Sequence, residues 1–142
     1  MFARYAVAAT LVLLIGSYAD NWRGGADAAQ TAVGENTALT QLRLINKSQA
    51  AYATRHGHFA CTLAELGDQY GLIDRDLSDG QKDGYSFSLH CATDPSQPAY
   101  QVWATPINTH VTGNAHYCTD ATGALGRARW QFDLCSGAGP IH

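Results

Sequence analysis

The spacing of apolar residues changes once along this chain, and the change limits the folds that are open to it. Between residues 35 and 56, the apolar side chains Ala38, Leu42 and Ile45 recur at helical spacing. From Tyr85 onward, apolar and polar residues alternate, which is typical of a strand with one buried face. The sequence therefore predicts one amphipathic helix followed by a sheet that shares its core.

The helix is expected to contain some twenty residues and to end where basic side chains precede a glycine. Arg55 and His56 suit the negative end of a helix, and Gly57 is able to adopt a left-handed cap. Gln49 is the polar residue in the apolar stripe, and we expect its amide at the edge of the buried face. Residues 29–34 are predicted as either a linker or the first turns of this helix.

Four segments have the composition and alternation of strands, separated by turn-forming residues. They are residues 85–91, 99–105, 116–118 and 127–132. The 142 residues are enough for one domain but not comfortably for two. The predicted fold class is therefore α+β, with a long N-terminal amphipathic helix packed on a roughly four-stranded antiparallel sheet and stabilised by disulfides.

Residues 1–28 have the composition of a leader. Residues 5–19 are uncharged and mostly apolar, and small residues at Ala26 and Ala28 suit cleavage by signal peptidase. This apolar stretch is short compared with the ~20 residues that span a bilayer, so we favour a signal peptide cleaved after Ala28. The alternative is an uncleaved anchor with Trp22 and Arg23 at the membrane interface. Residues 29–142 would form the domain.

Four cysteines lie beyond the leader and form no C-x-x-C pair. They are Cys61, Cys91, Cys118 and Cys135. Three pairings are possible, and we favour Cys61–Cys91 with Cys118–Cys135 because each joins neighbours in chain order. An even set of cysteines behind a leader indicates an extracytoplasmic protein, whether periplasmic, secreted or membrane-anchored.

A second, short helix is predicted near residue 62. Thr62 and Glu65 have the spacing of a capping box, in which a hydroxyl and a carboxylate bind free amides at a helix start. This helix is expected to end by Gly67. Residues 68–84 are rich in turn formers, and the apolar pair Leu72 and Ile73 is expected to enter the core.

The charge pattern and the motif content exclude several classes of function. The net charge is −3, with 9 Lys and Arg against 12 Asp and Glu, and no basic run is present that would mark a nucleic-acid partner. No G-x-S-x-G, H-E-x-x-H or phosphate-binding glycine loop occurs. We therefore expect no catalytic residue, no metal and no cofactor, and interpret the chain as a protein that is not an enzyme.

Two groups of potential metal ligands have simpler interpretations. His56, His58 and Cys61 lie within six residues, but a disulfide at Cys61 leaves two histidines without an obvious third ligand. The other group is a run of four aspartates, Asp74, Asp76, Asp79 and Asp83. Counted from Asp74, the glycine and glutamate positions of an EF-hand are not occupied by those residues, so a solvated acidic turn is expected.

The remaining aromatic and histidine side chains leave alternatives open. Trp103 and Trp130 form either a binding patch or, as we favour, part of the packing around the sheet. His90 alternates away from the apolar strand face and is expected on the surface. His110 and His116 have no serine or aspartate assigned to them by the sequence.

Several short motifs together resemble a known bacterial group. An L-R-x-I-N helix, an L-x-x-L-G segment, a G-L-I-D stretch, a K-x-G-Y-x-F turn and an aromatic-x-T-D-x-x-G hairpin follow one another in this order. They occur here at residues 42–46, 63–67, 71–74, 82–87 and 117–123. In this order and spacing they resemble the type IV pilin-like proteins related to the general secretion pseudopilins.

The resemblance implies a pilin-type fold and a non-catalytic structural or interaction module, such as a subunit or accessory of a type IV pilus or type II secretion system. It also implies protein partners or self-assembly, with inner-membrane anchoring through the leader. The leader departs from the pilin pattern, because its one glycine before residue 20, Gly16, is followed by Ser17 rather than phenylalanine. The alternative function is a secreted binding protein or small hydrolase on the same fold.

Overall fold

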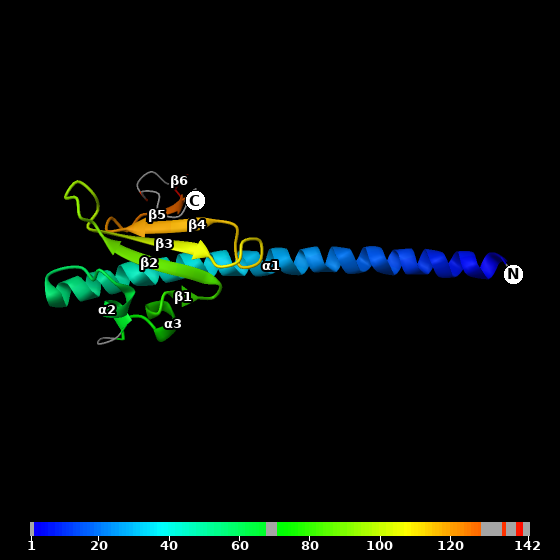
Figure 1. Cartoon of the computed structure of the whole chain (residues 1–142), viewed down its shortest axis with the longest axis horizontal. Coiled ribbons are helices and arrows are strands. Elements are labelled where there is room, and N and C mark those ends of the chain that lie inside the picture. Colours follow the sequence, from blue (N-terminus) through cyan, green and yellow to red (C-terminus); the bar gives the residue numbers. More distant parts are fainter. Residues whose placement is uncertain (1, 68–70, 129–134, 136–138, 141–142) are drawn as a thin grey trace.

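The computed structural model describes residues 2–67, 71–128, 135 and 139–140, and for residues 2–28 it gives the helical backbone without side chains. The chain has an α+β fold. One long helix, α1 (Phe2–His56), runs along one face of an antiparallel sheet and continues well beyond it toward the N-terminus (Figure 1). The fold class predicted from the sequence is confirmed at this level.

Helix α1 is much longer than the predicted helix of some twenty residues. Its 55 residues extend without a break through the polar segment 20–34. Of this segment, residues 20–28 were predicted as part of the leader and residues 29–34 as either a linker or the first turns of the helix, and the second of these alternatives is the one observed. The physical reason is that no proline occurs before Pro95, so nothing in this segment removes a helical hydrogen bond or clashes with the preceding turn. The predicted end is confirmed, since Gly57 has φ +75° and its amide donates to the Ala53 carbonyl.

The sheet is a meander whose strands follow chain order. Its strands are β1 (Gln81–Lys82), β2 (Tyr85–Cys91), β3 (Tyr100–Pro106), β4 (His116–Asp120), β5 (Leu125–Ala128) and β6 (Gly139–Pro140). Strands β2 to β5 correspond to the four predicted strands. The prediction missed the two short edge strands, β1 and β6. The last predicted strand begins at Leu125 rather than Arg127, and residues 129–132 lie outside the described part of the chain.

The turn between β1 and β2 has two central residues, Asp83 and Gly84, both with positive φ. This matches the twist of a tight hairpin, which requires residues tolerant of the left-handed region. The neighbouring helices are α2 (Leu63–Gly67), as predicted, and α3 (Arg75–Ser78), which was not predicted.

The core lies between α1 and the sheet. Apolar residues of α1 face the alternating side chains of the central strands and contact residues of α2 and α3. Its buried members on α1 and β2 to β4 are Ala38, Leu42, Ile45, Tyr52, Tyr85, Phe87, Leu89, Tyr100, Val102, Ala104 and Tyr117. From the predicted apolar pair, Ile73 is buried and Leu72 packs at the edge.

A smaller cluster is separate from this main core. Trp103, which alternates away from the core side of β3, packs with Cys118, Ala128 and Cys135. Trp103 is only 6% exposed, so packing rather than a binding patch describes this tryptophan. Trp130 lies outside the described residues.

Candidate functional site

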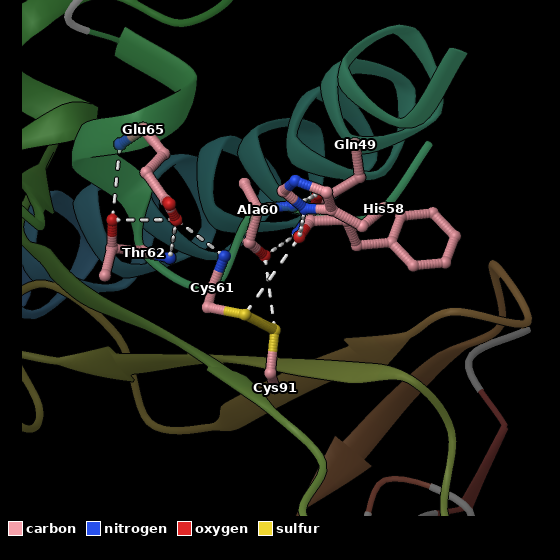
Figure 2. The surroundings of a disulfide bond; sticks show 8 residues. Gln49, His58, Ala60, Cys61, Thr62, Glu65 and Cys91 are labelled. Atoms are coloured by element: carbon pink, nitrogen blue, oxygen red, sulfur yellow. Dashed lines mark hydrogen bonds between the residues drawn. A yellow bond between two sulfur atoms is a disulfide. The ribbon is translucent and has the colours of Figure 1, made fainter. Parts of the chain in front are cut away.

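The distal end of the domain, where α1 ends, is held together by a side-chain amide. Gln49 Nε2 donates to the Ala60 carbonyl at 2.8 Å, and Gln49 Oε1 accepts from the Ala60 amide at 2.9 Å. Both residues are fully buried. The sequence placed this amide at the edge of the buried face, which was wrong: it is inside, satisfying the backbone of the segment that leaves the helix (Figure 2).

We call the two hydrogen bonds between Gln49 and Ala60 the Ala60 clamp. Directly after Ala60, the Cys61–Cys91 disulfide joins the segment that follows α1 to the end of β2 (Figure 2). The second disulfide, Cys118–Cys135, joins β4 to the C-terminal region. These are the two pairings favoured from the sequence, and no free cysteine remains. Two disulfides indicate an oxidising, extracytoplasmic environment.

A groove of about 700 Å³ lies beside the first disulfide. It separates the last turn of α1 and the segment after it from the β2–β3 loop. Its lining residues are Ala53, Gly57, His58, Phe59, Cys61, Cys91, Ala92, Thr93, Asp94, Pro95, Gln97 and Ala99. The groove has the size of a small-molecule site, but its polar groups are already engaged: His58 Nδ1 lies 3.1 Å from the Phe59 carbonyl, and Asp94 accepts from the Ser96 amide.

The predicted capping box is formed at the start of α2 (Figure 2). The Glu65 amide donates to Thr62 Oγ1 at 3.3 Å, and Glu65 Oε2 accepts from the Thr62 amide at 2.9 Å and the Cys61 amide at 2.7 Å. Burial opposes ionisation of the Glu65 carboxyl, but these hydrogen bonds outweigh it and hold its pKa below the usual value. The carboxylate thus ties the cysteine segment to the helix.

We expect the replacement Glu65→Gln to reduce the acid sensitivity of folding. A lowered pKa stabilises the native state fully above the unfolded value of 4.5, and this stabilisation disappears as the pH falls through the lower native value. Urea unfolding of both proteins between pH 6 and pH 3 measures the effect. The wild-type protein should lose more stability over this range than the variant, and parallel curves would contradict the role of Glu65.

The two groups of potential metal ligands are not assembled into a site. Within the described residues, no group of three or more His, Cys, Asp or Glu side chains is arranged to hold an ion. Asp74 caps α3 by accepting from the Leu77 amide and pairs with Lys82, whose hydrogen bond lowers the Asp74 pKa. Asp79 forms an exposed pair with Arg75.

The histidines of the strands and of the β3–β4 loop lie in separate surroundings. The exposed His90, as predicted, lies on the surface, where its ring contacts Trp103 edge-on at 5.6 Å. His110 Nδ1 lies 2.9 Å from Asn114 Oδ1, and His116 Nδ1 lies 3.3 Å from Thr105 Oγ1. None of these three contacts joins a histidine to a serine or carboxylate.

A polar network joins the middle of α1 to the β4–β5 hairpin. Asn46 Oδ1 accepts from the Tyr100 hydroxyl at 2.9 Å, and its Nδ2 donates to Thr119 Oγ1 at 2.6 Å. Thr119 in turn donates to the Ala124 carbonyl across the hairpin. Burial, together with the nearby Asp120, raises the pKa of Tyr100 to about 12, so its hydroxyl stays a donor at neutral pH. The network fixes the angle of the helix against the sheet.

The other end of the molecule is dominated by α1 itself. The described side-chain contacts of α1 with the sheet loops begin at Thr31, whose hydroxyl donates to the His110 and Val111 carbonyls at 3.4 Å. Figure 1 shows α1 continuing away from the domain toward the N-terminus. We call residues 2–28 the protruding segment; at 1.5 Å per residue it is about 40 Å long.

Comparisons with known proteins identify no relative: no family model, no curated protein and no solved structure matches this chain. Among the residues that the structure describes, there is no helix of sufficient length and apolarity to cross a membrane.

Proposed function

We propose that this chain is a non-catalytic, extracytoplasmic pilin-like module that acts through self-association or protein partners, with the protruding segment as its assembly and anchoring element. The observation that carries the proposal is the continuity of α1, which passes without interruption from the apolar residues 5–19 into the core of the domain. A helix that extends beyond its own domain and begins with an apolar run is suited to packing against a membrane or another protein.

The positions of the motifs that resemble those of pilin-like proteins support the same proposal. Residues 42–46 and 117–123 are far apart in the sequence, yet Asn46 and Thr119 are hydrogen-bonded. The 82–87 segment forms the tight Asp83–Gly84 turn, and its Tyr85 is fully buried in the core. The motifs thus act together to join a long helix to a hairpin sheet, the arrangement that a pilin-like module requires.

The proposal implies that the protruding segment is retained rather than cleaved after Ala28. Retention would attach the module to the inner membrane or to a pilus or secretion apparatus through residues 5–19, whereas cleavage would leave a secreted or periplasmic domain. Among the side chains that the structure describes, the contacts of α1 with the sheet loops begin at Thr31, beyond the cleavage position, so we expect the folded part to tolerate either outcome. The two outcomes differ in mass and in location, which makes them measurable.

The test is the intact, unreduced mass and the location of the full chain expressed with its leader, together with chemical cross-linking. We expect a full-length, membrane-associated species with two disulfides that cross-links into oligomers. The variant Leu13→Asp, which places a charge in the apolar run, should release the protein and abolish the oligomers. Ala50→Asp, an exposed site on the domain part of α1, is the matched control and should behave as wild type.

A soluble monomer beginning at Ala29 would contradict this proposal. The second candidate, a secreted binding protein or small hydrolase, would then be favoured by the 700 Å³ groove beside Cys61–Cys91, which is large enough for a small ligand and is lined by His58 and Asp94.

A further inference from the structure

The groove beside Cys61–Cys91 lies between two walls that are each held by bonds within the domain. One wall is the segment after α1, which the Ala60 clamp ties to the helix and the disulfide ties to β2 (Figure 2). The other wall is the β2–β3 loop, in which the Ala92 amide donates to the Ala99 carbonyl at 3.0 Å. Because both walls are supported, the groove is already formed before any ligand arrives, as ligand sites usually are.

The first wall contributes the imidazole of His58. Its Nδ1 lies 3.1 Å from the Phe59 carbonyl, which can only accept a hydrogen bond, so in the neutral ring Nδ1 carries the proton and Nε2 the lone pair. The ring also lies edge-on to the buried Tyr52, with the two centroids 5.8 Å apart. His58 therefore adds a hydrogen-bond acceptor to the lining.

The second wall contributes a carboxylate. Asp94 Oδ1 accepts from the Ser96 amide at 2.9 Å, and hydrogen bonding by Ser96 lowers the pKa of this carboxyl, which is ionised at neutral pH. A carboxylate has about four acceptor positions, so this bond leaves others for a ligand. Of the described residues that line the groove, Asp94 is the only Asp, Glu, Lys or Arg. Beside the lining, Glu65 holds a second carboxylate 2.7 Å from the Cys61 amide. The groove therefore favours a ligand that brings donors and positive charge.

The rest of the lining is mostly apolar. Phe59 is half-buried, with its ring edge-on to Tyr100 at a centroid distance of 4.9 Å, and the disulfide, Pro95 and alanine side chains lie around it. An aliphatic chain that ends in a cation matches both features, because its methylene groups pack on apolar surface while its charge stays beside a carboxylate. A groove of about 700 Å³ has room for a drug-sized molecule, so the residues that flank such a side chain in a peptide also fit.

We propose that this groove binds a lysine or arginine side chain that an extended segment of a protein partner presents. The aliphatic stem packs on Phe59 and the disulfide, and the cation donates to Asp94. Figure 1 shows the end of α1 at the opposite end of the molecule from the protruding segment, so the partner binds far from the N-terminus. The inference goes beyond the proposed function and does not depend on whether the leader is retained.

The test uses the full chain in mild detergent and a fluorescent, end-blocked peptide of sequence Gly-Leu-Arg-Leu-Gly, with anisotropy as the measure of binding. We expect this peptide to bind about three- to fivefold more tightly than its Gln counterpart, the range for an exposed ion pair. Asp94→Asn keeps the oxygen that accepts from Ser96 but removes the charge, so it should abolish the preference. Asp76→Asn, which changes an exposed carboxylate on α3, is the matched control and should leave the preference unchanged.

Two further variants separate the groove from general surface charge. Asp94→Lys should reverse the preference, so that a peptide with Glu in the central position binds more tightly than the Arg peptide. Ala99→Leu places apolar atoms in the groove at an exposed position and should weaken binding of every peptide without changing the urea midpoint. Unchanged binding by this variant would place the peptide elsewhere and contradict the inference.

Three other results would also overturn the inference. They are equal binding of the Arg and Gln peptides by the wild-type chain, an equal loss of preference in Asp76→Asn, and binding of free butylguanidine as tight as that of the Arg peptide. The last result would indicate a small-molecule site rather than a protein partner. A soluble monomer that prefers the Arg peptide would refute the proposed function yet support this inference, whereas a membrane-bound oligomer without the preference would do the reverse.

Discussion

Replacing Gln49 with leucine is expected to destabilise the domain by about 2–4 kcal/mol. Leucine fills a similar volume, but it leaves the buried amide and carbonyl of Ala60 without their hydrogen bonds. Each buried backbone group that loses its partner costs about 1–3 kcal/mol, while the added apolar burial offsets part of the loss. Urea unfolding without reductant, monitored by intrinsic fluorescence, measures the difference in unfolding free energy between the variant and the wild-type protein.

The same substitution at Gln41 is the matched control. Gln41 is also on α1 and only 8% exposed, but its buried Oε1 has no hydrogen-bond partner among the described residues. Leucine there removes a polar atom that is not satisfied within this part of the chain, so we expect a change within about 1 kcal/mol, or a small stabilisation. Equal losses at Gln41 and Gln49 would mean that the Ala60 clamp does not carry the effect.

Gln49 also illustrates where sequence-based prediction succeeded and where it did not. Its position in the apolar stripe was visible, and so were the helix end at Gly57 and the alternation of β2. These features depend on local periodicity and on residues with special backbone preferences. The full burial of the Gln49 amide was not predictable, because it depends on Ala60 returning to the helix after a reversal of the chain.

The length of α1 was missed for a related reason. Residues 20–34 lack an apolar stripe, so periodicity gives no signal for a helix there, although no proline prevents one. Strands β1 and β6 contain two residues each, too few to show alternation. Helix α3 is one turn, but the Asp74 cap before it follows a known preference and was the available signal.

The candidate surfaces were beyond sequence reasoning altogether. Thr31 contacts His110, which is 79 positions away in the sequence, and the groove beside Cys61–Cys91 is lined by the end of α1 and by the β2–β3 loop. Only the cysteine pairing carried a sequence signal for such a long-range contact. Proximity in chain order was enough to favour Cys61–Cys91 and Cys118–Cys135. An apolar residue can pack against any other apolar residue, so the sequence does not indicate which residues it contacts.

Removing either disulfide by paired alanine substitutions is expected to destabilise the domain, and the Cys118–Cys135 pair should cost more. The bonds join residues 30 and 17 positions apart, so loss of chain restriction alone costs about 3–4 kcal/mol in each case. Cys61 is exposed, whereas Cys118 and Cys135 are buried against Trp103. Their removal also leaves a cavity, which raises the expected loss to about 4–6 kcal/mol.

Urea unfolding of Cys61→Ala/Cys91→Ala and Cys118→Ala/Cys135→Ala without reductant compares the two losses, with reduced wild-type protein as the control for losing both. Equal losses would argue against the buried packing of Cys135 beside Trp103. If both losses occur, their sum is comparable with the 5–15 kcal/mol that stabilises a typical domain. The reduced chain would then be largely unfolded, so folding of this module would require the oxidising compartment that its disulfides indicate.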